Sequence, residues 1–282
     1  MFLTMRKLGQ YLVRSLQTGF ARRWMTEVSP GMLGRSAVVF SPHADDETLG
    51  CGGTLIKKRA AGATVKIAFM TDGRTSHGHL MPADRLIALR AQEAVAAAQV
   101  LGLAESDVCF LGFPDSRLHE HEGAAVERVK EILKACLPEE VFIPYRRDNT
   151  PDHLATYRIV SASLRQLSLP VTVYEYPVWF WNHWPWVSFV PRRKGLRVLR
   201  DSFSAGYGLR LLITFRHYVS VQDVLDRKRA ALEQHASQMT RLVPDPRWKT
   251  LSDVAGGDFL KCFFQPWEVF CVYRTGGRLP PL

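Results

Sequence analysis

Cysteine is scarce and scattered in this chain of 282 residues. The five cysteines form an odd number, contain no CxxC pair and lie far apart, at positions 51, 109, 136, 262 and 271. This spacing excludes a compact disulfide framework and makes the reducing cytoplasm the expected location. The first 29 residues also lack a long apolar core and a small-residue cleavage site, so we do not expect a secretory signal there.

Long apolar runs and phosphate-binding glycine loops are missing as well. No apolar run is long enough for a membrane-spanning helix, although 46% hydrophobic residues suit a globular chain. Glycines cluster at positions 50–53, but the GxGxxG spacing of a dinucleotide loop is absent. We therefore expect an N-terminal segment, residues 1–30, followed by a single α/β domain over residues 31–282.

Acidic residues are fewer than basic ones: the chain has 27 aspartates and glutamates and 37 lysines and arginines, which gives a net charge of +10. Such a charge suits a nucleic acid, an anionic membrane or a phosphorylated substrate. The basic residues gather before Glu27 and between Arg192 and Arg200, and neither cluster resembles a nucleic-acid-binding module. The hypothesis of a nucleic-acid-binding domain is supported by the net charge alone, so we expect no nucleic-acid partner.

Residues 5–25 have the pattern of a basic amphipathic helix. Leu8, Leu12, Leu16 and Phe20 recur every four residues, with arginines and glutamines between them. Two alternatives stay open: the helix packs on the body or on a second copy in a homo-oligomer, or residues 1–25 lie on an anionic membrane. The expected location is thus the cytoplasm, with peripheral attachment to the inner membrane surface under the second alternative.

Apolar, β-rich runs alternate with helical patterns along most of the remaining chain. The expected strands are residues 37–41, 65–71, 108–111, 141–144 and 171–176. One expected helix begins at residue 47, and three others cover residues 83–101, 123–137 and 152–167. Near-continuously apolar strands separated by helices indicate a Rossmann-like three-layer sandwich with a mostly parallel sheet. In such sheets, ligands bind at the carboxyl ends of the strands.

Residues 177–206 interrupt this alternation and are expected to form an insertion or a lid, rich in aromatic and then basic residues. Its tryptophans could pack the lid onto the body, stack on sugar rings or lie at a membrane interface, and they are Trp179, Trp181, Trp184 and Trp186. After it come an apolar run near residues 211–215, a helical pattern over residues 221–242 and a late strand near residues 268–273.

Two polar loops that follow predicted strands carry metal-binding residue types. The first loop contains His43, Asp45 and Asp46, and the second covers Asp148 to His153. Because the carboxyl ends of parallel strands share one edge of the sheet, the two loops can meet, and His43, Asp46 and His153 can hold one cation.

Two histidines and one carboxylate leave an open position on zinc for water, as catalytic zinc sites require. The metal lowers the pKa of that water toward neutrality, and Asp45 is placed to take its proton as general base, so that hydroxide adds to an amide carbonyl. The alternative for Asp45 is a cap of the next helix, in which its carboxylate accepts backbone N–H groups.

These residues resemble the motifs of the PIG-L/LmbE-like family of zinc-dependent N-acetylglucosamine deacetylases. Its members carry His-Pro-Asp-Asp-Glu after the first strand and a second motif ending in Pro-Asp-His, which are similar to His43–Glu47 and Pro151–His153 here. The similarity covers roughly residues 36–176 and continues weakly to Gln238. The resemblance implies that His43, Asp46 and His153 bind the metal and that Asp45 is the base.

The resemblance further implies hydrolysis of the acetamido group of an N-acetylated sugar of the N-acetylglucosamine type, with Zn²⁺ or another divalent metal. The basic N-terminal helix and the aromatic insertion favour a lipid-linked or nucleotide-linked intermediate of cell-surface glycan synthesis, because either carries phosphate. Arg90 is expected to bind a sugar hydroxyl or phosphate, or else to be a solvated helix residue paired with Glu93. Asp115 is expected to accept a sugar hydroxyl, or else to be an ordinary loop carboxylate.

Two positions depart from the family pattern. Ala44 replaces a proline, which is a mild backbone change, and Thr150 replaces a histidine that helps to stabilise the oxyanion or to protonate the leaving amine. The oxyanion or supporting candidates are therefore Thr150, Asp152 and His235, and the histidines that could substitute are His77, His79, His217 and His235. The alternative function is a catalytically weak or inactive relative that binds metal or carbohydrate.

Overall fold

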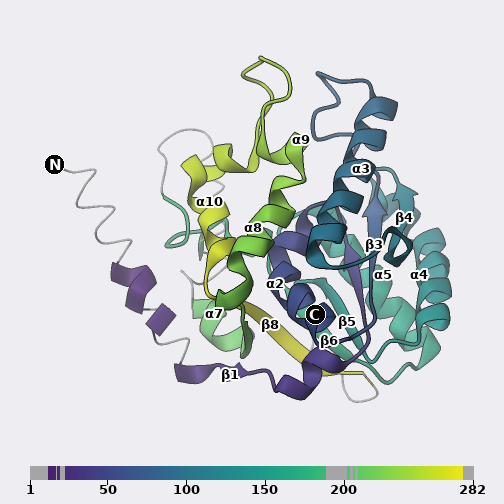
Figure 1. Cartoon of the computed structure of the whole chain (residues 1–282), viewed down its shortest axis with the longest axis vertical. Coiled ribbons are helices and arrows are strands. Elements are labelled where there is room, and N and C mark those ends of the chain that lie inside the picture. The colour runs from purple at the N-terminus through teal and green to yellow at the C-terminus, as the bar shows by residue number, and fades with distance from the viewer. Residues whose placement is uncertain are drawn as a thin grey trace.

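The computed structural model describes residues 12–16, 18–19, 23–188, 202–203, 206 and 209–275. Their strands form one sheet of eight, in the order β1-β7-β8-β6-β5-β2-β3-β4 (Figure 1). The strands are β1 (Thr26–Glu27), β2 (Ala37–Ser41), β3 (Val65–Thr71), β4 (Val108–Phe113), β5 (Glu140–Pro144), β6 (Thr172–Tyr176), β7 (His217–Ser220) and β8 (Trp267–Arg274). The strands from β4 to β6 are parallel, and β8 is antiparallel to both of its neighbours.

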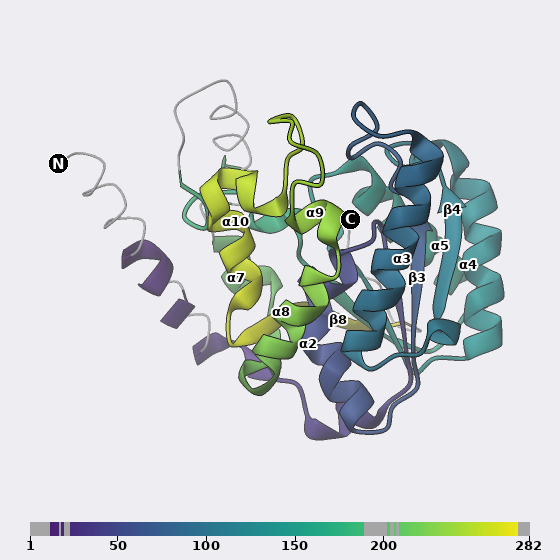
Figure 2. The ribbon, with the colours of Figure 1, turned by 45° about the horizontal axis from the view of Figure 1, so that its top comes forward.

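Helices cover both faces of this sheet (Figure 2). The longer helices are α2 (Asp46–Ala60), α3 (Ala83–Leu101), α4 (Glu122–Cys136), α5 (Pro151–Leu167), α7 (Leu209–Thr214) and α8 (Leu225–Glu233). The shorter ones are α9 (Ala236–Met239), α10 (Asp258–Lys261) and the 3-10 helices η1 (Pro30–Gly34), η2 (Glu105–Asp107), η3 (Leu118–His121), η4 (Trp179–Trp181), η6 (Gln222–Val224), η7 (Leu251–Gly257) and η8 (Cys262–Phe264). The predicted three-layer sandwich with a mostly parallel sheet is therefore confirmed.

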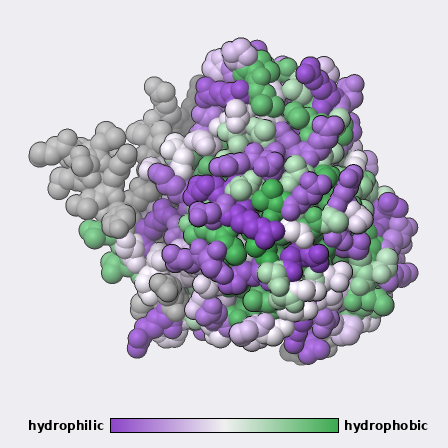
Figure 3. Space-filling view, viewed as in Figure 1, coloured by the Kyte–Doolittle hydropathy of each residue, from purple (hydrophilic) through white to green (hydrophobic). Residues whose placement is uncertain are grey.

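The strand periodicity explains the two cores. Successive side chains of a strand point to opposite faces, so Ala37 and Val39 of β2 join the core under α2, α3 and α8, while Val38 and Phe40 join the core under α4 and α5. Hydrophilic side chains cover much of the outer face that α3 and α8 form (Figure 3). An apolar strand between two covered faces is what the parallel arrangement requires.

Several element boundaries follow from local chemistry. The predicted helix over residues 83–101 matches α3, which ends at Gly102 because this residue adopts a left-handed conformation with φ of 96°. Pro151 occupies the first turn of α5, where its missing N–H leaves no hydrogen bond unmade. These local signals are strong enough to be recognised in the sequence.

The helix predicted over residues 221–242 is wrong in its extent. The segment contains η6, α8 and α9, and α8 ends at Glu233 because His235 leaves the helical conformation and turns its ring toward Glu47. The apolar run near residues 211–215 is helical and belongs to α7. Strands β1, of two residues, and β7, of four residues, were not predicted.

The glycine cluster at residues 50–53 permits close packing of α2. A Cβ atom on Gly50 would lie 2.2 Å from the ring of Tyr176, and one on Gly53 would lie 2.7 Å from Val221. A buried ion pair also contacts the backbone of this helix: Lys228 Nζ donates to Leu49 O at 2.9 Å, while Glu268 accepts the N–H of Gly53 at 2.7 Å. The pair thus binds one carbonyl and one N–H of α2 and fastens the helix to α8 and β8.

The predicted insertion packs largely onto the body where the structure describes it. Trp181 and Trp186 are buried in the core, which favours the packing alternative for these two tryptophans, whereas Trp179 is half-buried. Near the N-terminus, residues 12–16, 18–19 and 23–24 are helical and lie at the edge of the molecule (Figure 1), but Leu8 and Phe20 lie outside the described residues. Across the described part of the chain, no helix has the length and apolar character needed to cross a bilayer.

Replacing Lys228 with Met should lower the free energy of unfolding by about 3–5 kcal/mol, because Glu268 would remain buried without its partner. Urea denaturation followed by circular dichroism measures the change. The matched control is Lys57→Met on α2, whose ion pair with Asp223 is solvent-exposed and should contribute less than about 1 kcal/mol. Equal losses in the two variants would contradict the assignment of the buried pair.

Candidate functional site

The site lies at the carboxyl edge of the sheet, where β2 and β5 are neighbours. The loop after β2 carries His43, and the loop after β5 leads into α5, which carries His153 in its first turn. The two imidazole rings lie with their centroids 5.4 Å apart. Strand adjacency therefore brings together side chains that are far apart in the sequence.

His43, Asp46 and His153 present three ligand atoms to one point. Asp46 Oδ2 lies 3.1 Å from His43 Nδ1 and 3.0 Å from His153 Nε2. Ligands about 2 Å from a tetrahedral zinc ion lie about 3.3 Å from one another, so these separations suit such an ion. The ligand atoms of the three residues all lie within 4.8 Å of one another, which defines a candidate metal site.

The hydrogen bonds of His153 support this interpretation. Its Nδ1 lies 2.8 Å from Asp148 Oδ2, and because the carboxylate can only accept, Nδ1 carries the proton. The Nε2 atom therefore presents a lone pair, and it is buried without a hydrogen-bond partner from the residues that the structure describes. A lone pair that is buried and unsatisfied beside a carboxylate fits a divalent cation.

Asp148 is a supporting residue to which the sequence analysis gave no role. The carboxylate is fully buried and also accepts the backbone N–H groups of Val178 and Phe180. It thereby fixes the ring of His153 and ties the insertion to the site. Its place at the start of the Asp148–His153 run was the available signal, since a second carboxylate near a ligand histidine commonly orients the ring.

The other nitrogen of His43 faces two further carboxylates. Nε2 lies 3.2 Å from Asp152 Oδ2 and 3.3 Å from Asp115 Oδ1. Burial by itself lowers the pKa of His43, but Asp115, Asp152 and Asp46 outweigh it and raise the pKa well above its usual value. Although these residues could also surround a cation, Asp152 is already occupied by the N–H of Ser116, so we interpret the carboxylates as supports that orient His43.

Asp45 is held in an unfavourable backbone conformation at the start of α2. Its φ is 129°, which is costly for a residue with a side chain, and its N–H donates to Glu47 Oε2 at 3.1 Å. Burial and the neighbouring charge of Asp46 raise the pKa of Asp45 to about 7, while a bound cation would lower it. The side chain makes no capping hydrogen bond, so the structure gives no support to the helix-cap alternative.

His235 lies behind Asp45 and supports it indirectly. Its Nε2 is 3.2 Å from Glu47 Oε1, and Glu47 in turn accepts the N–H of Asp45. Both side chains are buried, and neither lines the site cavity. The structure therefore favours a supporting position for His235 over an oxyanion position.

Arg90 is buried beside the site. The guanidinium donates to Ala44 O at 2.6 Å and to Ser76 Oγ at 3.3 Å, and its Nη2 lies 3.9 Å from Asp45 Oδ2. Glu93 instead accepts the N–H and hydroxyl of Ser237. The alternative of a solvated Arg90 paired with Glu93 is therefore wrong, whereas binding of a sugar hydroxyl or phosphate by Arg90 stays a prediction.

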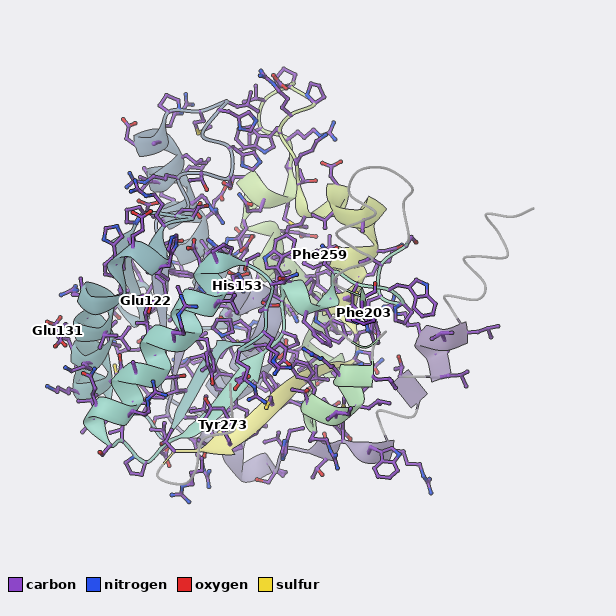
Figure 4. All side chains as sticks on the ribbon, turned by 180° about the vertical axis from the view of Figure 1, so that it is seen from behind. Glu122, Glu131, His153, Phe203, Phe259 and Tyr273 are labelled. Carbon is purple, nitrogen blue, oxygen red and sulfur yellow. The ribbon has the colours of Figure 1, made fainter. Side chains whose placement is uncertain are left out.

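A cavity of about 350 Å³ opens over these residues. Its polar side includes Asp45, Arg90 and Asp115, and Thr150 Oγ1 is buried there without a hydrogen-bond partner. Its apolar side is formed by Leu49, Val178, Trp179, Leu251, Val254 and Phe259. Figure 4 shows that His153 on α5 and Phe259 on α10 both lie in the central region of the molecule. Of the four histidines that could substitute for the family histidine, only His77 lines the cavity.

Two imidazoles and a carboxylate that converge beside a free carboxylate form an arrangement suited to a hydrolase. A sequence model of the PIG-L family, described as GlcNAc-PI de-N-acetylase, matches residues 38–164. The uncharacterized deacetylase YaiS of Escherichia coli strain K12 is 26% identical over 163 residues, which cover 56% of this chain and 80% of YaiS. The family model thus covers the segment that carries both motifs, and the resemblance to the PIG-L family inferred from those motifs is confirmed.

Solved structures share the fold. N,N'-diacetylchitobiose deacetylase from Pyrococcus horikoshii has a TM-score of 0.57 and 20% identity, covering 85% of this chain and 84% of that chain. GalB, the 4-carboxy-2-hydroxymuconate hydratase from Pseudomonas putida KT2440, has a TM-score of 0.54 and 16% identity, and the match covers 88% of this chain and 99% of GalB. Since a hydratase shares the fold, the fold alone does not determine the chemistry. The descriptions of the family and of YaiS support a hydrolase that acts on amides.

Replacing Asp148 with Asn should weaken zinc binding about 10- to 100-fold, because an amide orients the His153 ring less well than a carboxylate does. Competition with a chromophoric chelator measures the dissociation constant, and circular dichroism verifies that the variant is folded. Asp226→Asn, at an exposed position on α8, is the control and should leave the affinity unchanged. An unchanged affinity in Asp148→Asn would refute the supporting role.

Proposed function

We propose that this protein hydrolyses the acetamido group of an N-acetylated sugar of the N-acetylglucosamine type in a zinc-dependent reaction. The observation that carries the proposal is the convergence of His43 Nδ1, Asp46 Oδ2 and His153 Nε2 beside the carboxylate of Asp45. The family relationship and the deacetylase relatives support it. A zinc ion held there would act as a Lewis acid toward the amide carbonyl and the attacking water.

Asp45 is the proposed general base. Its carboxylate lines the cavity without a capping hydrogen bond, so it can take a proton from the attacking water and return it to the leaving amine. The products are acetate and a free amino sugar, which balances the one water consumed. Arg90 stabilises the ionised form of Asp45, since its positive charge lowers the pKa of the carboxyl group.

Thr150 is the proposed hydrogen-bond donor to the carbonyl oxygen as negative charge develops there. Its hydroxyl is buried and has no hydrogen-bond partner in the described part of the chain. A neutral hydroxyl stabilises an oxyanion less than an imidazolium does, because it contributes a dipole and no net charge. The presence of Thr150 where the family motif has a histidine also supports the second candidate function, a catalytically weak or inactive relative that binds metal or carbohydrate.

Recognition of the sugar is assigned to the cavity walls. Asp115 holds Thr75 and His43 and also lines the cavity, so acceptance of a sugar hydroxyl by this carboxylate stays a prediction. Trp179 stacks on Phe259 at a centroid distance of 4.9 Å and offers an apolar surface to a sugar ring or a linked lipid. The net charge of +10 suits the phosphate of a lipid-linked or nucleotide-linked substrate.

Both predicted alternatives for the N-terminal segment, packing on protein and contact with a membrane, stay open. Leu12 and Leu16 are 53% and 73% exposed, which leaves an apolar surface for a membrane or a second copy of the chain. The Arg14 guanidinium lies 5.2 Å from the ring centroid of Trp186, which favours docking of this segment on the body. Peripheral membrane contact, homo-oligomerisation and a cytoplasmic location therefore stay predictions.

Replacing Asp45 with Asn should retain zinc and lower kcat by about 10²- to 10⁴-fold, because an amide cannot accept the proton of the attacking water. Acetate release from N-acetylglucosamine and N,N'-diacetylchitobiose measures turnover, and elemental analysis measures the metal. Asp226→Asn serves again as the surface control. A variant that keeps full activity, or that loses its zinc, would contradict the assignment of Asp45.

Removing the Thr150 hydroxyl tests its role as donor. Thr150→Val should lower kcat by about 100-fold, whereas Thr150→Ser should keep most of the activity because a hydroxyl remains. Thr150→His should raise kcat above the wild-type value if the imidazole reaches the same oxygen. Equal activity of the Val and Ser variants would favour another donor, and no acetate release from any of these proteins, despite sugar binding, would favour the binding-protein alternative.

A further inference from the structure

His77 is a cavity residue that the proposed reaction does not use. It lies between β3 and α3, its side chain is buried, and its ring stacks on Trp248 with a centroid distance of 4.0 Å and an interplanar angle of 9°. Its Nε2 atom lies 2.8 Å from the backbone oxygen of Lys249. The ring is thus fixed on one face and at one nitrogen.

This contact determines which nitrogen carries the proton. A carbonyl oxygen can only accept, so Nε2 is the donor, and in the neutral ring Nδ1 is left with a lone pair. Burial lowers the pKa of His77, and the nearby charges of Arg90 and His79 lower it further, while the Lys249 carbonyl opposes them. Nδ1 is buried and has no hydrogen-bond partner among the described residues.

The support behind His77 keeps this lone pair in a fixed position. Trp248 is fully buried, and its indole N–H donates to Ser237 O at 2.9 Å. Ser237 is held in turn by Glu93, which accepts its N–H at 2.7 Å and its hydroxyl at 2.6 Å. A buried acceptor that is rigid and unsatisfied costs free energy until a donor occupies it.

We propose that His77 is a specificity-determining residue whose Nδ1 accepts a hydrogen bond from one hydroxyl group of the substrate. The inference rests on the proposed function and adds the chemical class that this part of the cavity selects. A neutral hydroxyl satisfies the lone pair, whereas a phosphate or carboxylate oxygen would face it with another lone pair. The same tautomer makes His77 unsuitable as the oxyanion donor that replaces the family histidine.

The test compares His77→Gln with wild type on N-acetylglucosamine and its 3-deoxy, 4-deoxy and 6-deoxy derivatives. Gln retains an N–H for the Lys249 carbonyl but has no acceptor at the Nδ1 position. Wild type should lose roughly two- to tenfold in kcat/KM on one deoxy derivative, mainly through KM, and His77→Gln should lose the same factor on the parent sugar. The variant should no longer distinguish that derivative from the parent.

Two controls make the outcome specific. His79→Gln, at an exposed position outside the cavity, should behave as wild type on all four sugars. His77→Asn restores a polar atom near the Nδ1 position and should recover part of the discrimination. A His77→Gln variant that still distinguishes every derivative as wild type does, or that loses the same factor on all of them, overturns the inference.

Failure of the proposed function gives a different result. If zinc-loaded wild type releases no acetate, the same four sugars are compared by calorimetric binding. Selective loss of affinity for one deoxy derivative, abolished in His77→Gln, would then support the His77 contact without the hydrolase. Absence of binding by all four sugars would overturn both proposals.

Discussion

The Asp46 carboxylate lies between the imidazole nitrogens of His43 and His153, and the rest of the site is built around these two contacts. His43 reaches it from the loop after β2, and His153 reaches it from the first turn of α5. These loops meet because β2 and β5 are parallel neighbours, so both end at the same edge of the sheet. Without that adjacency, the three side chains could not converge.

Burying so many ionisable groups is costly unless each has a partner, and the structure supplies one for each part of the site. Asp148 orients His153, Asp115 and Asp152 orient His43, and Glu47 fixes the backbone of Asp45. Buried polar atoms that find no partner among the described residues, such as His153 Nε2, Thr150 Oγ1 and His77 Nδ1, are therefore informative. The first suits a metal, and the other two lie on residues that line the cavity and suit a substrate.

The relationship to known proteins separates fold from chemistry. A deacetylase and a hydratase both share this architecture at low sequence identity, so the architecture is compatible with more than one reaction. The assignment to amide hydrolysis therefore depends on the PIG-L match over residues 38–164 and on the side chains at the strand ends. Of the two departures from the family motifs, Thr150 has the larger chemical effect, because its neutral hydroxyl offers an oxyanion a dipole and no net charge.

The sequence by itself determined the layered α/β class, the parallel strands and the two motifs, because apolar periodicity and strand-end polarity are local properties. It did not reveal the break before His235, the burial of Arg90 or the support that Asp148 gives to His153. Each of these depends on a contact between residues that only the folded chain brings together. The tautomer of His77 is the clearest case, since a backbone oxygen far along the chain decides which ring nitrogen keeps its lone pair.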